Sequence, residues 1–147
     1  MGPHLSRGGA AMRRMLPGIV VACLVVVVAV GCRGGGQIYQ VKDAPVQTAT
    51  GKQPSLEDVQ KAIITAGAGL GWQMAMAKPG EIIGTLNLRK HQAVVSILYT
   101  TKNYSILYKD SNNLQYDAEK QTIHKNYSSW IQNLDGAIRS RLTAAGM

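Results

Sequence analysis

The feature that most constrains this chain is an unbroken run of twelve apolar residues, Ile19–Val30, which follows the basic pair Arg13-Arg14. A helix that crosses a bilayer needs about 20 apolar residues, with a lower limit of about 17. A twelve-residue run behind a basic segment is instead typical of a secretory signal peptide. We therefore expect residues 1–31 to be a leader outside the fold, with the true start at Met1, Met12 or Met15 left open.

The end of this run resembles the cleavage site of bacterial lipoprotein precursors. Ala29-Val30-Gly31-Cys32 is similar to the lipobox, in which a small residue precedes the cysteine that becomes the lipid-bearing N-terminus; Leu is commoner than Ala at its first place. The resemblance covers only the leader and implies that Cys32 is lipidated, with fatty acids such as palmitate. Two alternatives stay open: a soluble periplasmic protein with a free cysteine, and an uncleaved anchor.

The same resemblance implies a location. Arg33 follows the cysteine, where many Gram-negative lipoproteins retained in the inner membrane carry Asp. In a Gram-negative cell this favours the outer membrane, with the protein facing the periplasm. Cleavage would leave 116 residues with 13 basic and 8 acidic side chains, a formal charge of +5. Cys23 would leave with the leader, so Cys32 would be the only cysteine.

Residues 32–54 are expected to be the lipidated cysteine followed by a flexible tether. They are rich in Gly, Pro, Gln, Thr and Lys and show neither helical nor strand periodicity. A flexible linker of this kind, 22 residues long, spans roughly 25 Å on average. The remaining residues, 55–147, are expected to form one small envelope domain.

The domain begins with a helix signal. Ser55 is the expected N-cap and Asp58 stands at the capping-box position. Apolar residues then recur at helical spacing, and glycines end the pattern near Gly71. A second amphipathic helix is expected over about 126–142, with Asn126 as its N-cap and an apolar stripe that includes Tyr127 and Trp130.

Three or four strands are expected between the helices. Ser96-Ile97-Leu98-Tyr99 is repeated as Ser105-Ile106-Leu107-Tyr108, which suits a hairpin. If Tyr99 pairs with Tyr104, then Ile97 pairs with Ile106 and Val95 with Tyr108, all on one face. The pattern predicts an α+β fold of order α-β-β-β-β-α, a two-layer sandwich with both helices on one face of an antiparallel sheet.

One group of apolar side chains is not covered by any predicted helix or strand. A turn between Lys78 and Glu81 would place Ala75 and Ala77 toward the helices, and Trp72, Met74 and Met76 on the opposite face. Exposed apolar patches of this kind commonly contact a protein partner. A β-bulge near Pro79-Gly80 is the competing interpretation, because it would turn Trp72 and the methionines inward.

No pattern of catalytic, metal-binding or cofactor-binding residues stands out. His91 and His124 lack a second ligand at metal-binding spacing, and the acids between Asp110 and Glu119 do not form an EF-hand loop. The glycines between Gly67 and Gly71 end a helix, whereas nucleotide-binding loops open one. We therefore expect neither a cofactor nor a metal.

The functional expectation is a non-enzymatic lipoprotein that serves as a binding or structural accessory in the periplasm or outer membrane. The alternative is a periplasmic enzyme or enzyme inhibitor with an unrecognised site, for example a pocket that joins His91 or His124 to an acid. The membrane is contacted through the lipid, and the basic charge favours anionic lipids or glycans as further partners. No nucleic-acid-binding motif is present.

Overall fold

The computed structural model describes residues 35–145. The predicted leader and Cys32 lie outside the described residues. The domain is built on a five-stranded antiparallel sheet of strand order β2-β6-β5-β4-β3. These strands are β2 (Val41–Pro45), β3 (Gln73–Lys78), β4 (Glu81–Leu88), β5 (His91–Tyr99) and β6 (Asn103–Asn112).

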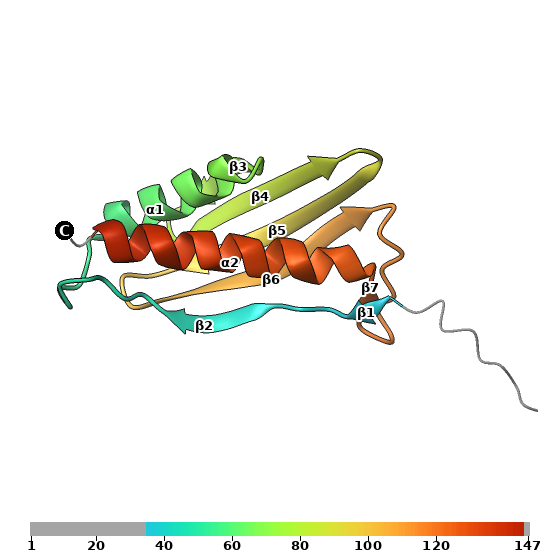
Figure 1. Ribbon diagram of the computed structural model, residues 1–147, viewed down its shortest axis with the longest axis horizontal. Coiled ribbons are helices and arrows are strands. Elements are labelled where there is room, and N and C mark those ends of the chain that lie inside the picture. The colour runs from blue at the N-terminus through green and yellow to red at the C-terminus, as the bar shows by residue number, and fades with distance from the viewer. Residues whose placement is uncertain (1–34, 146–147) are drawn as a thin grey trace, which may run out of the picture. The chain divides into compact units, whose positions relative to one another are not determined.

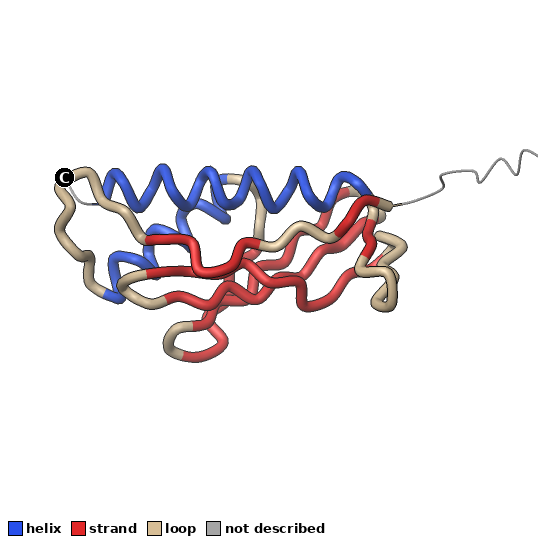
Figure 2. Tube along the Cα trace, turned by 90° about the horizontal axis from the view of Figure 1, so that it is seen from below, coloured by secondary structure: helices blue, strands red, loops and turns tan. Residues whose placement is uncertain are grey.

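Two helices, α1 (Leu56–Gly69) and α2 (Lys125–Ala145), cover one face of this sheet (Figures 1 and 2). Strands β1 (Gly36–Gln37) and β7 (Thr122–Ile123) form a separate two-stranded sheet beside the start of α2. The predicted α+β class and the two helices on one face are therefore confirmed. The sheet is larger than expected, and two strands precede α1.

The expectation of a flexible tether over residues 33–54 is wrong where this segment forms β1 and β2, whereas residues 46–54 contain neither helix nor strand. Strand β2 pairs with β6, so that Val41 lies opposite Ile106, and the side chains of Val41 and Ala44 are each only 6% exposed. A bulge between these two residues shifts the register. The bulge places the buried residues three apart, and the alternation that identifies a strand in a sequence is lost.

The predicted hairpin is confirmed. Strands β5 and β6 pair Tyr99 with Tyr104, Ile97 with Ile106 and Val95 with Tyr108, all toward the helices. Strand β6 continues to Asn112, beyond the predicted end at Tyr108, across a bulge opposite Val94 and Val95.

The predicted start of α1 is also confirmed. The Ser55 hydroxyl accepts a hydrogen bond from the Asp58 backbone N–H (3.1 Å), and the Asp58 carboxylate accepts one from the Ser55 backbone N–H (3.2 Å). The helix ends at Gly69, and Gly71 adopts a φ of +87° that favours glycine.

Helix α2 begins at Lys125, so Asn126 is not its N-cap. The backbone N–H of Asn126 instead donates to Nδ1 of His124 (3.3 Å), just before the helix. The predicted apolar stripe faces the core. Its fully buried members are Tyr127, Ile131, Leu134, Ile138 and Leu142, and Trp130 packs at the core's edge.

The predicted surface patch of Trp72, Met74 and Met76 is not found. A bulge between Met76 and Lys78 pairs Met74 with Gly84 and Met76 with Ile82, so these residues share the helix side of the sheet. Trp72 is 4% exposed and Met74 packs on the core, while Ala75 and Ala77 face solvent. The competing interpretation, a bulge near Pro79-Gly80, is therefore correct. Met76 stays 52% exposed because β3 is an edge strand.

Candidate functional site

The sheet face away from the helices carries only scattered apolar side chains. Leu98 is 41% exposed, and Ile83 and Leu107 are half-buried. Ser96 pairs with both Ile83 and Leu107, and its hydroxyl donates to the Glu81 carboxylate (2.6 Å). This hydrogen bond lowers the pKa of Glu81. Ser96 thus separates Ile83 from Leu107 on this face.

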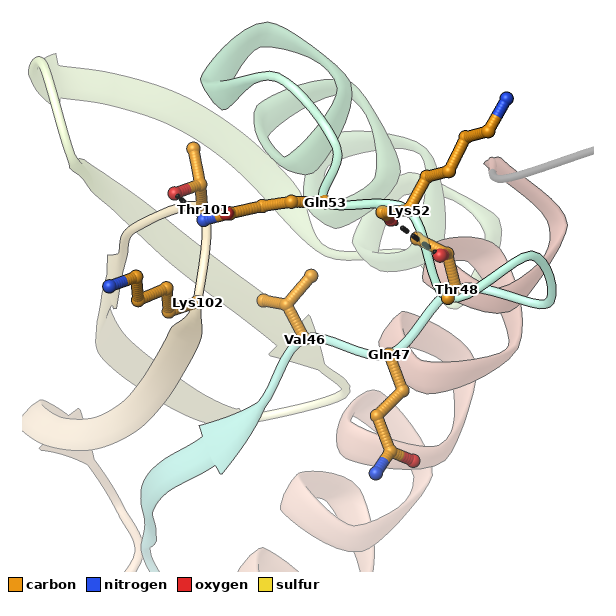
Figure 3. Close-up of a pocket in the computed structure, with 8 residues that line it drawn as sticks. Val46, Gln47, Thr48, Lys52, Gln53, Thr101 and Lys102 are labelled. Carbon is orange, nitrogen blue, oxygen red and sulfur yellow. Dashed lines mark hydrogen bonds between the residues drawn. The ribbon is translucent and has the colours of Figure 1, made fainter.

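A shallow hollow of about 530 Å³ lies between the loop of residues 46–53 and the turn of residues 100–102. The ammonium groups of Lys52 and Lys102 extend away from each other, and Gln47 points away from the hollow (Figure 3). The Thr48 hydroxyl donates to the Lys52 carbonyl (2.7 Å), and Thr101 accepts from the Gln53 amide (2.6 Å). The polar groups here support the loop and do not converge on a ligand.

The two histidines of the described chain meet at one end of the domain, which the sequence did not indicate. The rings of His91 and His124 have centroids 5.4 Å apart, and Trp130 lies 6.5 Å from His91. Nδ1 of His91 lies 2.7 Å from the Asn113 carbonyl, which can only accept, so this nitrogen carries a proton. Nδ1 of His124 accepts from the Asn126 backbone N–H. Both histidines therefore hold neighbouring backbone in place.

This end of the domain, called here the β1–β7 end, gathers four segments. They are Gly35 with β1, the β4–β5 turn of residues 89–90, the loop of residues 113–121, and residues 122–125. The Gln37 amide donates to the Lys120 carbonyl (3.3 Å), and the Asn113 amide donates to the Lys90 carbonyl (3.2 Å). These hydrogen bonds tie segments that are far apart in the sequence.

Acidic side chains at this end have local structural roles. One oxygen of Asp117 accepts the backbone N–H groups of Glu119 and Lys120, both at 3.0 Å, and the other lies 3.2 Å from the Lys120 ammonium. The same contacts lower the pKa of Asp117. The carboxylate therefore closes a turn. Among residues 35–145, no three His, Cys, Asp or Glu side chains are grouped closely enough to hold a metal ion.

Three tyrosines pack beside the β1–β7 end. Tyr108 stacks on Tyr116 with centroids 4.1 Å apart and meets Tyr127 edge-on at 6.0 Å. Tyr127 is fully buried, whereas Tyr108 and Tyr116 are half-buried. A tyrosine has an apolar ring and a polar hydroxyl, so a half-buried tyrosine suits the boundary between an apolar and a polar environment.

A buried polar group lies under the middle of α2. Asp135 is 7% exposed; its carboxylate accepts from the Tyr104 hydroxyl (2.5 Å) and from Nε of Arg139 (3.0 Å). The arginine is more than half exposed, so it links this carboxylate to solvent. The arrangement neutralises a buried charge and attaches α2 to β6.

Comparisons with known proteins give no match: no family model, no curated protein and no solved structure is similar to this chain. None of the helices between residues 35 and 145 is both long and apolar enough to cross a membrane.

Proposed function

We propose that this protein is a lipid-anchored lipoprotein of the cell envelope, attached to the membrane through Cys32, with a non-enzymatic binding or structural role. The observation that carries the proposal is Gly31-Cys32 at the end of a twelve-residue apolar run behind two arginines. The domain follows this motif after a short interval in the sequence, since Gly35 packs on Ile123 of β7.

The non-enzymatic role is supported by the structural contacts of three aspartates and of both histidines in the described chain. Asp58 caps α1, Asp117 closes a turn, and Asp135 pairs with Tyr104 and Arg139. The two histidines bond to backbone groups. An envelope accessory needs a stable shape at the membrane, and this use of polar groups favours such a shape.

The anchor is tested by metabolic labelling with radioactive palmitate. The full chain is expressed in a Gram-negative host as wild type, Cys32→Ser and Cys23→Ser. We expect wild type and Cys23→Ser to incorporate label and to partition into detergent. Cys32→Ser is expected to lose the label, because the lipid is attached through a thioether bond to the Cys32 sulfur. Equal labelling of the two variants would contradict the proposal.

The outer membrane is the proposed location in a Gram-negative cell, because Arg33 stands where retained lipoproteins carry Asp. Sucrose-gradient separation of the two membranes tests it. We expect the wild type in the outer-membrane fractions and Arg33→Asp in the inner-membrane fractions. Labelled wild-type protein in the inner membrane would contradict this location while leaving the anchor intact.

A further inference from the structure

The link between the proposed lipid and the folded domain is short. Three residue steps separate Cys32 from Gly35, which is at most about 11 Å between Cα atoms. Gly35 packs so closely on Ile123 that a Cβ atom there would overlap the Ile123 backbone carbonyl. The next two residues pair with β7, so this part of the chain is fixed to the domain. A lipid on Cys32 therefore brings the β1–β7 end close to the bilayer surface.

The β1–β7 end displays basic side chains. Arg89, Lys90, Lys120 and Lys125 are all exposed. Two acids, Asp117 and Glu119, lie in the same loop, and Asp117 pairs with Lys120. The described residues at this end thus have a net charge of +2.

Half-buried aromatic side chains accompany these charges. Trp130 lies beside His91, and Tyr116 stacks on Tyr108 within the same end. Trp and Tyr favour the headgroup level of a bilayer, and Lys and Arg near an anionic leaflet are attracted within a Debye length. The chemistry of this end suits an anionic membrane surface.

We infer that the β1–β7 end is a docking surface for anionic phospholipid headgroups of the leaflet that holds the lipid anchor. The domain then stands with its opposite end away from the bilayer. This inference rests on the proposed anchor at Cys32. The opposite end, called here the far end, comprises the C-terminus of α2, the start of α1 and the hollow of Figure 3.

Helix α2 runs from one end to the other (Figures 1 and 2). Nineteen residue steps separate Lys125 from Ala144, which corresponds to about 28 Å along a helix. The Thr143 carbonyl accepts from the Ala49 backbone N–H (3.2 Å), which places the loop of residues 46–53 at the far end. The two ends are thus separated by more than the reach of screened headgroup charges.

The test uses two matched reporters, Ala118→Cys at the β1–β7 end and Ala144→Cys at the far end. Both positions are exposed, and the mature chain has no cysteine other than the acylated Cys32. Each purified, lipidated full-length variant is labelled with a fluorophore. It is then inserted into vesicles of phosphatidylethanolamine and phosphatidylglycerol that carry a headgroup nitroxide quencher.

We expect quenching at position 118 to be at least about threefold stronger than at position 144, because contact is limited to one end. Equal quenching would mean that the domain lies flat, and no quenching at either site would mean that it stands off the bilayer; each result overturns the inference. Flotation of the protein with the vesicles is measured in parallel. Failure to float contradicts the anchor itself, so the two failures are distinguishable.

Charge variants test the headgroup contact. Lys90→Gln combined with Lys125→Gln should reduce quenching at position 118 by at least about half, as should replacing phosphatidylglycerol with neutral phosphatidylcholine. The control, Lys61→Gln combined with Lys102→Gln, removes the same charge from the far end and should leave quenching unchanged. Equal loss in both double variants would overturn the docking surface, since only overall charge would then matter.

Discussion

Two buried tyrosine hydroxyls in this domain have opposite surroundings. The Tyr104 hydroxyl donates to the Asp135 carboxylate, and burial together with this contact raises the pKa of Tyr104. The Tyr127 hydroxyl is buried and has no hydrogen-bond partner among residues 35–145. Burial also raises the pKa of Tyr127. A satisfied and an unsatisfied hydroxyl should respond differently to removal.

Tyr104→Phe should destabilise the domain by about 1–3 kcal/mol, because Asp135 loses a partner while it stays buried. Tyr127→Phe should be neutral or slightly stabilising, because it removes a polar group that folding has desolvated. Urea unfolding of the two variants beside wild type measures both changes. A matched control is Tyr99→Phe, whose hydroxyl bonds to the half-buried Gln60 (3.1 Å) and should cost less than Tyr104→Phe. A larger loss for Tyr127→Phe than for Tyr104→Phe would contradict this assignment.

At the scale of the element, α1 depends on its capping box. Hydrogen bonds from Ser55 lower the pKa of Asp58 below its ordinary value of 3.8. A carboxyl whose pKa is lower in the folded state contributes stability above the unfolded pKa. That contribution is lost as pH falls through the folded pKa.

Asp58→Asn should therefore weaken the dependence of stability on pH in the acid range, with the largest difference from wild type above pH 3.8. Thermal unfolding followed between about pH 6 and pH 2 measures this. Glu57→Gln is the control, because Glu57 lies in the same turn but outside the hydrogen-bonded pair. Parallel pH profiles for wild type and Asp58→Asn would contradict the role of the cap.

Elements built from local contacts were predictable, and strand pairings were not predictable beyond a bulge. The β5–β6 hairpin joins neighbouring segments, so its repeated Ser-Ile-Leu-Tyr pattern was enough to predict the register. Strand β2 and the β3–β4 register each contain a bulge that breaks the period of two. A single extra residue reverses every later side chain, which is why the predicted Met74 and Met76 patch was on the wrong face.

At the scale of the whole molecule, residues 38–46 complete the domain. Strand β2 forms an edge of the sheet, and Val41 and Ala44 join the same core as α1 and α2. Ile38 and Val46 pack against that core from either side of the strand. A segment with the composition of a linker is therefore part of the fold.

Replacement of residues 38–46 by a Gly/Ser segment of equal length should cost about 3 kcal/mol or more, or roughly 10 °C in Tm, because it removes buried apolar side chains. The same replacement over residues 49–53, which are exposed, should have little effect. Thermal unfolding of both variants measures the difference. Equal Tm values for the first variant and wild type would restore the tether interpretation.

Features that depend on neighbouring residues could be recognised in the sequence alone. These are the capped start of α1, the apolar stripe of α2, the β5–β6 hairpin and the α+β class. Helical periodicity, capping and hairpin register are local, so they can be recognised without knowing the fold.

Contacts between segments that are distant in the sequence became known only from the fold. His91 and His124 come together because the start of β5 and the end of β7 lie at the same end of the domain. His91 is the first residue of β5, and His124 follows β7 directly. Antiparallel pairing also brings Gly35 to Ile123, across almost the whole domain sequence. Such contacts depend on the pairing of distant segments and on bulges, and neither produces a periodic pattern of apolar residues in the sequence. The place of Gly35 beside β7 could therefore not be predicted from the sequence.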